Sequence, residues 1–97
     1  MHARAVMVPV DPGKLDEMLK IWKESVLPAA QSQQGFKGAL VLGDRTTGDG
    51  ISISLWDSEA DMVAGESSGY YQEQLAKFGG IFAGKPDLKH YEVFLQV

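Results

Sequence analysis

Apolar residues recur at every second position in some stretches of the chain and at every third or fourth position in others. The first spacing predicts strands and the second predicts helices. The strand-like stretches are rich in Val, Ile, Ala and Leu and are bounded by Gly, Pro and Asp. They predict strands over residues 2–10, 36–43, 51–56 and 88–97. Residues 44–50 carry Asp and Gly and suit a hairpin turn.

A long helix is predicted between the first and second strands. Asp11 can cap it, and Pro12 suits its first position, where a missing N–H costs nothing. Pro28 should kink this helix because it lacks a hydrogen-bond donor and crowds the carbonyl group of Glu24. Gly35 is a natural terminator. The apolar stripe expected to face the sheet consists of Leu15, Met18, Leu19, Trp22 and Val26.

A pair of shorter helices is predicted between the third and fourth strands. Ser58 and Asp61 resemble a capping box that opens the first of them, which should end near Gly65. In the second, Tyr71 should turn toward the core, whereas Tyr70 is expected nearer the rim because adjacent helix positions do not share a face. The residues expected to share the inner face are Tyr71, Leu75 and Phe78.

The predicted order is strand, helix, strand, strand, helix pair, strand, which is the split βαβ arrangement of the ferredoxin-like α+β fold. Such a fold has an antiparallel four-stranded sheet with helices on one face only. Both faces of the predicted strands are apolar, so the second face needs a cover. A second copy of the sheet would provide it, which predicts a homodimer in the form of a dimeric α+β barrel. In the third strand, Ile51, Ile53 and Leu55 alternate with Ser52, Ser54 and Trp56.

Length and composition narrow the class of protein. The chain has 97 residues, 44% of them hydrophobic, which gives room for a single domain over residues 1–97 with a thin core. It has no cysteine, so disulfides, cysteine-based zinc sites and thiolate catalysis are excluded. The net charge is −4, and its 9 Lys and Arg are scattered, which argues against nucleic acid as a partner.

No stretch of the sequence predicts a membrane span or a signal peptide. The longest apolar runs are far shorter than the roughly 20 residues that a spanning helix needs. Residues 1–10 lack a long apolar core and a small-residue cleavage site. We therefore expect a cytoplasmic protein with no membrane partner. The 2 histidines are far apart and offer no ligand spacing, so no metal is expected.

Three segments of the chain resemble the antibiotic-biosynthesis-monooxygenase-like family of dimeric α+β barrels. They are Gly35-Phe36-Lys37-Gly38, the turn of residues 44–48, and above all Ile53-Ser54-Leu55-Trp56-Asp57-Ser58-Glu59. The strongest mark is a Trp that ends the third strand and is followed by a Ser and acidic residues that open a helix. The resemblance covers nearly the whole chain and implies this fold. Members of the family include cofactor-free oxygenases of phenols and quinols, haem-degrading enzymes and proteins with no known reaction.

The chain departs from both enzymatic branches of the family. It contains no Asn, and Ser52 stands four residues before Trp56, where the quinol oxygenases that it resembles tend to carry Asn. The haem-degrading branch uses an Asn, a second Trp and an iron-ligating His in the helical segment, but residues 61–75 contain neither His nor Trp. The comparison with the family therefore disfavours haem degradation and weakens quinol oxygenation without excluding it.

Trp56 occupies the hallmark position, and its indole can serve as a packing anchor or as the wall of a pocket. If its strand face points at the helices, the small residues Ser52 and Ser54 leave a hollow where a planar ligand could bind. The opposite orientation stays open, because sequence alone does not set which face meets the helices. Tyr71 and Trp22 belong to the core pattern and are further candidates for binding a substrate.

His90 is the candidate catalytic residue, because an imidazole titrates near neutral pH; the alternative is a surface or packing residue. Two hypotheses of function follow. The resemblance implies a homodimer that oxygenates an apolar or aromatic, quinol-like small molecule without a bound cofactor. The alternative is a non-catalytic dimeric module that binds a small molecule. The ligand-sensing domain of a transcription regulator shares the topology and is a third class.

Overall fold

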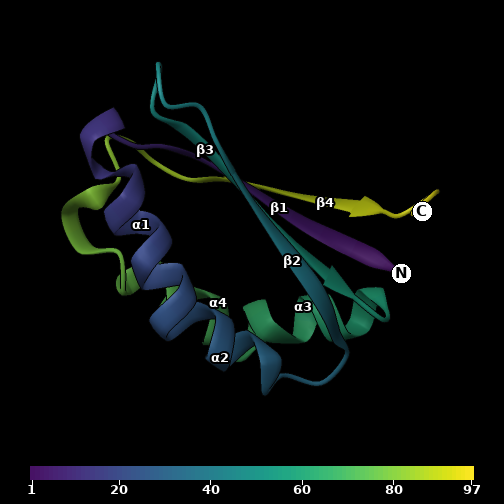
Figure 1. Ribbon diagram of the computed structural model, residues 1–97. Coiled ribbons are helices and arrows are strands. Elements are labelled where there is room, and N and C mark those ends of the chain that lie inside the picture. The colour runs from purple at the N-terminus through teal and green to yellow at the C-terminus, as the bar shows by residue number, and fades with distance from the viewer.

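The chain folds into two layers, a sheet and a set of helices that cover one of its faces (Figure 1). The computed structural model describes residues 1–97. Its strands are β1 (His2–Pro9), β2 (Phe36–Gly43), β3 (Asp49–Trp56) and β4 (Asp87–Glu92). Its helices are α1 (Leu15–Ile21), α2 (Leu27–Gln31), α3 (Glu59–Ser67) and α4 (Tyr70–Ala76). Short 3-10 turns lie at Pro12–Lys14 and Gly79–Ile81, and a π-helical turn at Trp22–Val26 joins α1 to α2.

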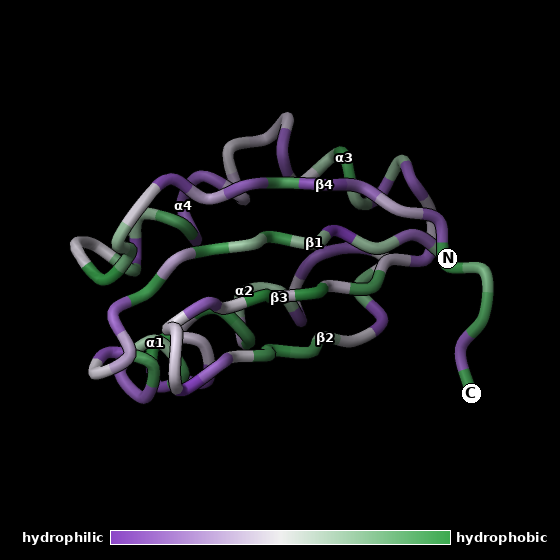
Figure 2. The backbone as a smooth tube through the Cα atoms, turned by 90° about the horizontal axis from the view of Figure 1, so that it is seen from above, coloured by the Kyte–Doolittle hydropathy of each residue, from purple (hydrophilic) through white to green (hydrophobic).

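The sheet has four strands in the order β2-β3-β1-β4, and every neighbouring pair is antiparallel (Figure 2). With the helices on one face, this is the ferredoxin-like α+β fold, and the predicted fold class is confirmed. The register sets Arg4 of β1 opposite Ser54 of β3 and His90 of β4. Residues directly opposite one another share a face of the sheet, so these three lie on the same side.

The alternation of β3 settles which strand face looks toward the helices. Ser52, Ser54 and Trp56 lie on the helix side, where they border a cavity. On the other side of the sheet, Leu40 and Leu42 of β2 are 56% and 46% exposed. The outer face is therefore apolar, and no helix of this chain covers it (Figure 1).

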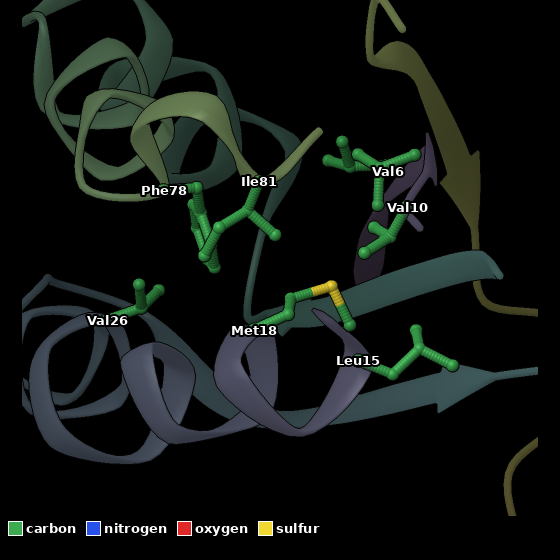
Figure 3. Close-up of a cluster of buried hydrophobic side chains, with 8 residues drawn as sticks. Val6, Val10, Leu15, Met18, Val26, Phe78 and Ile81 are labelled. Carbon is green, nitrogen blue, oxygen red and sulfur yellow. The ribbon is translucent and has the colours of Figure 1, made fainter. Parts of the chain in front are cut away.

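The main core lies between β1 and the helices (Figure 3). β1 contributes every second residue, because successive side chains of a strand point to opposite faces. Burial of each Val or Leu side chain contributes roughly 1.5–3 kcal/mol, so this cluster anchors the helices on the sheet. Its buried members are Val6, Val8, Val10, Leu15, Met18, Val26, Phe78 and Ile81.

Two predicted helix caps are confirmed. The side chain of Asp11 accepts a hydrogen bond from the backbone N–H of Gly13 at 2.9 Å. The hydroxyl of Ser58 accepts one from the backbone N–H of Asp61 at 3.1 Å and opens α3. α3 continues to Ser67, two residues beyond its predicted end near Gly65.

Pro28 changes the geometry of the first helix without ending it. Because Pro28 has no N–H to donate to Glu24, the backbone widens into the π-helical turn of Trp22–Val26 before α2 begins. α2 ends at Gln31, earlier than the terminator that the sequence suggested. Gly35 instead makes the turn into β2 with a φ of +82°, a left-handed conformation that favours glycine.

The last strand is shorter than the alternation of residues 88–97 predicts, and this prediction is wrong for its second half. β4 ends at Glu92, which lies opposite His2, the first residue of β1. Beyond that point the N–H of Val93 donates to the carbonyl oxygen of Met1 at 2.9 Å. No strand of this sheet stands opposite the residues that follow, so their alternating pattern has no ladder to join.

The segment after β4 exposes its apolar side chains. Phe94 and Leu95 are 90% and 83% exposed, and Figure 2 shows the segment leaving the sheet. Both the outer sheet face and this segment therefore offer apolar surface to a partner. None of the helices has the length and apolarity that a membrane span requires.

Candidate functional site

A cavity lies between the sheet and the helices. Its volume is about 60 Å³. An apolar cavity that binds benzene measures roughly 150 Å³, so an aromatic ligand would require the side chains of this wall to move apart. Of the 18 residues that line it, 14 are hydrophobic, which suits an apolar or aromatic guest. The polar ones are Arg4, Ser52, Ser54 and Gln74.

Trp56 forms a fixed part of the cavity wall. It is 1% exposed, and its indole Nε1–H donates to the hydroxyl oxygen of Ser54 at 2.9 Å. Its ring meets that of Phe36 edge to face, with 5.7 Å between the ring centroids and 77° between the planes. The hydrogen bond satisfies the buried indole N–H, so Ser54 positions the Trp side chain.

The structure brings the predicted pocket residues together. Ser52, Ser54, Trp56, Tyr71 and Trp22 all line the one cavity. β3 supplies the first three, α4 supplies Tyr71, and the π-helical turn supplies Trp22. That these residues bind a substrate stays a prediction.

Tyr70 also lines the cavity, although the helical spacing placed only Tyr71 inside. Gly65 of α3 leaves room for its ring, since an added Cβ there would lie 3.2 Å from Cδ2 of Tyr70. Burial raises the pKa of both phenols above the ordinary value of 10.0, and the positive charge of Arg4 opposes this. Both phenols therefore keep their protons at neutral pH and can donate hydrogen bonds.

Arg4 is the charged residue of the cavity wall, and it is 4% exposed. Its Nε–H donates to Oε2 of Glu66 at 3.2 Å, and its Nη2–H donates to the carbonyl oxygen of Met62 at 2.5 Å. The centre of the guanidinium lies 5.3 Å from the ring centroid of Trp56 and 5.2 Å from that of Tyr71. An arginine does not lose its proton in a protein, so the cavity wall carries a permanent positive charge between two aromatic rings.

His90 lies opposite Arg4 on the neighbouring strand β4 and does not line the cavity. Its Nε2 is 2.7 Å from Oε2 of Glu66, the same oxygen that accepts from Arg4. The His90 side chain is 40% exposed. This arrangement does not support direct proton transfer between His90 and a molecule in the cavity. It supports a positioning role, in which His90 orients Glu66 and Glu66 holds Arg4.

Gln74 of α4 is the second buried polar residue of the cavity wall. Its Nε2–H donates to the carbonyl oxygen of Tyr70 at 3.4 Å. Its Oε1 is buried and has no hydrogen-bond partner. A buried acceptor without a donor costs about 1–3 kcal/mol, so a donor group of a ligand that reaches Oε1 would relieve this cost.

Sequence reasoning missed Arg4, Glu66 and Gln74. A signal for Arg4 existed, because it shares the strand parity of Val6 and Val8, so a charge interrupts the buried face of β1. Glu66 and Gln74 carry no such signal. Glu66 lies 62 positions from Arg4 in the sequence, and only the packing of α3 on β1 brings the two together.

The structure offers no cluster of metal ligands. No group of three or more His, Asp or Glu side chains lies close enough together to hold an ion. The expectation of a reaction without a bound cofactor stays a prediction.

Comparison with known protein sequences finds relatives of part of the chain. No family model matches it. Curated relatives in Mycobacterium tuberculosis are the uncharacterized proteins MT2634 of strain CDC 1551 and Rv2557 of strain ATCC 25618. Each is 38% identical over 55 residues, which cover 57% of this chain and 25% of the relative. The chain thus spans about a quarter of the length of these curated relatives.

Solved structures match over almost the whole chain. A Bordetella bronchiseptica protein, whose name places it among the antibiotic biosynthesis monooxygenases, superimposes with a TM-score of 0.80 at 19% identity, covering 97% of both chains. The chain has the antibiotic biosynthesis monooxygenase-like fold. The resemblance that the sequence carries around Trp56 is confirmed at the level of the fold.

Two further structures with the monooxygenase-like fold hold small molecules. The monooxygenase ActVA-Orf6 of Streptomyces coelicolor, in complex with nanaomycin D, has a TM-score of 0.73 at 19% identity, covering 99% of this chain and 89% of that one. The heme-degrader MhuD of Mycobacterium tuberculosis, with two hemes bound in its active site, has a TM-score of 0.77 at 19% identity, covering 100% and 99%. At these identities the similarity establishes the shared fold, and the ligand of this chain must be argued from its own cavity.

Proposed function

We propose that the chain is a small oxygenase that uses no bound cofactor and acts on a quinol-like aromatic molecule in the cavity beside Trp56. The observation that carries the proposal is the cavity wall, in which 14 of 18 residues are hydrophobic and a buried arginine supplies a positive charge. Such a wall can hold an ionised phenol away from bulk water. The monooxygenase-like fold of the chain supports the proposal.

The reaction needs no outside reductant, because a quinol supplies the electrons itself. A phenol proton leaves to solvent, and Arg4 stabilises the remaining anion, since a nearby positive charge lowers the pKa of an acid. A ring carbon of the anion bonds to one atom of O₂, and a proton returned by solvent completes the hydroperoxide. The O–O bond then breaks: one oxygen stays on the carbon, and the other leaves as water with the hydrogen of that carbon. A hydroxyquinone and one water account for all atoms of the quinol and O₂.

The neutral groups of the cavity would orient the ring. Trp56 lines the cavity, and its edge-to-face contact with Phe36, which does not line it, fixes the indole ring. Tyr70 and Tyr71 keep their protons and can donate to a ligand oxygen. No side chain of the cavity wall can act as a base at neutral pH. Solvent would therefore accept the phenol proton.

We further propose that two copies pair through their outer sheet faces. Leu40, Leu42 and Tyr91 are each about half exposed on strands of the sheet. A chain of this size buries a modest core, so covering these side chains would add the apolar burial that the monomer lacks. The exposed apolar segment after β4 offers further contact area.

The proposed reaction is tested by oxygen uptake in the presence of a metal chelator. Small single-ring quinols and anthrone-type compounds are supplied under air, and the autoxidation rate is subtracted. We expect uptake that scales with protein concentration and falls at least about tenfold in Arg4→Met, the loss of about 1.4 kcal/mol of anion stabilisation. Arg45→Met, which removes an exposed guanidinium paired with Asp16, should match the wild type. Uptake no faster than autoxidation for every compound refutes the proposal.

A non-catalytic module that binds a small molecule is the second candidate. The position of His90 favours it, because the one acid–base candidate of the sequence lies outside the cavity wall. This candidate predicts saturable binding of aromatic molecules with no oxygen uptake. The same panel of compounds therefore separates the two functions when binding and uptake are both measured.

A further inference from the structure

Two buried polar side chains line a cavity that is otherwise mostly apolar. Arg4 and Gln74 are the buried polar or charged residues of the chain, and both line the same cavity. Burial of polar groups is unfavourable unless their hydrogen bonds are made. The hydrogen bonds that Arg4 and Gln74 do not make within the protein therefore indicate which chemical groups a ligand of this cavity should carry.

Arg4 leaves donors free. A guanidinium carries five N–H donors in a planar fork. Nε and Nη2 are bound to Glu66 and to the Met62 carbonyl group, while Nη1 makes no hydrogen bond to the protein. The protein thus holds one side of the fork and leaves donors of a permanent cation for a guest. An ionised oxygen is the acceptor that such a fork binds most strongly.

Gln74 leaves an acceptor free. Its Oε1 is buried without a partner, while its Nε2 is bound to the Tyr70 carbonyl group. The hydroxyl group of a ligand would supply the missing donor. Apolar side chains line most of the remaining wall, and they suit the faces and edges of an aromatic ring.

The size of the cavity limits the ring system. The cavity volume is about 60 Å³, smaller than the roughly 150 Å³ of an apolar cavity that binds benzene. A single ring is therefore the smallest aromatic ligand to consider, and it already requires side chains of the wall to move apart. Larger fused rings would require the helices to move away from the sheet.

We propose that the cavity selects a single-ring aromatic anion that also carries a hydroxyl group, of the hydroxybenzoate class, with its ionised oxygen on Arg4 and its hydroxyl on Gln74. This deepens the proposed function and rests on it for the assignment of the cavity as the ligand site, but not for turnover. The selectivity comes from charge at one end and from a hydrogen-bond donor at the other.

The test is a calorimetric titration of the full chain at neutral pH with probes that air does not oxidise. The probes are 3- and 4-hydroxybenzoate, the matching hydroxybenzamides, and benzoate. The amides keep the ring and the hydroxyl but carry no charge, and benzoate keeps the charge but lacks the hydroxyl. We expect the better hydroxybenzoate to bind at least about tenfold more tightly than its amide and about threefold more tightly than benzoate.

Paired variants separate the two contacts. Arg4→Met should make the acid and the amide bind alike, while Arg45→Met on the surface should keep the difference. Gln74→Met should remove the advantage of the hydroxyl, while Gln72→Met, at an exposed position of the same helix, should keep it. If Arg4→Met does not fold, two measurements still test the proposal. The binding of acid and amide to the wild type tests the contact with Arg4, and the two Gln variants test the contact with Gln74.

Equal binding of hydroxybenzoate and hydroxybenzamide to the wild type would overturn the inference, as would the absence of binding by every probe at millimolar concentration. The outcome is separate from that of the proposed reaction. Tight binding of hydroxybenzoate with no oxygen uptake from any quinol would remove the reaction and leave the selectivity. Oxygen uptake from neutral quinols, without tighter binding of hydroxybenzoate than of hydroxybenzamide, would support the reaction and overturn the selectivity.

Discussion

At the scale of single residues, the cavity depends on buried polar groups whose partners come from within the protein. The indole of Trp56 donates to Ser54, and Arg4 donates to Glu66. A buried polar group that loses its partner costs about 1–3 kcal/mol, whereas a residue that only borders the cavity costs little. Substituting a hydrogen-bond partner should therefore lower the free energy of unfolding more than substituting a residue that only borders the cavity.

Replacement of Ser54 by Ala should lower the free energy of unfolding by about 1–3 kcal/mol, because the buried indole N–H of Trp56 loses its acceptor. Ser52→Ala is the matched control, since Ser52 lies on the same strand face and makes no side-chain hydrogen bond. Its effect should stay within about 0.5 kcal/mol. Urea denaturation measures both. Equal stability of the two variants would show that the hydrogen bond does not hold Trp56.

Alkaline pH should destabilise the protein through Tyr70 and Tyr71. Burial raises the pKa of both phenols above 10.0, so above this pH the unfolded chain loses protons that the folded chain keeps. The folded state then binds more protons, and the free energy of unfolding falls as the pH rises. Urea denaturation on either side of this pH measures the fall. The double variant Tyr70→Phe, Tyr71→Phe should show a smaller fall, and a fall equal to that of the wild type would contradict the assignment.

At the scale of elements, local sequence signals placed most of the strands and helix starts. β2 and the caps at Asp11 and Ser58 follow from turn and capping chemistry that acts within a few residues. The strand predicted after Glu92 does not form, because an alternating pattern needs a partner strand, and the partner is a property of the whole sheet. The π-helical turn before Pro28 was predicted only as a kink, since sequence does not say how the backbone absorbs a missing donor.

Gly65 controls the approach of α3 to the site. A Cβ at this position would lie 3.2 Å from the Tyr70 ring and 3.3 Å from Nη2 of Arg4. We expect Gly65→Ala to lower the melting temperature, because crowding of two buried side chains, about 1–3 kcal/mol, exceeds the helix propensity gained, about 1 kcal/mol. Gly80→Ala is the control, since a Cβ there meets nothing and the position should tolerate it. A melting temperature of Gly65→Ala at or above the wild-type value would refute this close approach.

At the scale of the whole molecule, the arrangement of layers explains which site residues could be predicted. Ser52, Ser54 and Trp56 share a parity on one strand, so a single choice of face placed all three in the cavity. Arg4 and Glu66 meet only because β1 is central in the sheet and α3 packs on it. The outer face of the same sheet remains apolar, and the proposed pairing of two copies would cover it.

A charge on the outer face should prevent this pairing. Leu40→Lys would place a charge within the proposed interface, where burial without a partner is unfavourable, and should leave a folded monomer. Val63→Lys is the control, because Val63 is 37% exposed on α3, on the helix side of the molecule. Light scattering coupled to size exclusion measures the mass of each. A wild type that is already monomeric would contradict the proposed dimer. A dimeric Leu40→Lys variant would show that the copies pair through another surface.

The fate of molecular oxygen tests the central proposal most directly. The protein is mixed with a single-ring quinol under ¹⁸O₂, with a chelator present, and the product is analysed by mass spectrometry. The proposed reaction places one labelled oxygen atom on the ring and the other in water. A hydroxyquinone that carries one ¹⁸O atom is therefore the expected result. An unlabelled product, or no protein-dependent product, would contradict the proposal and leave a cavity that binds without reacting.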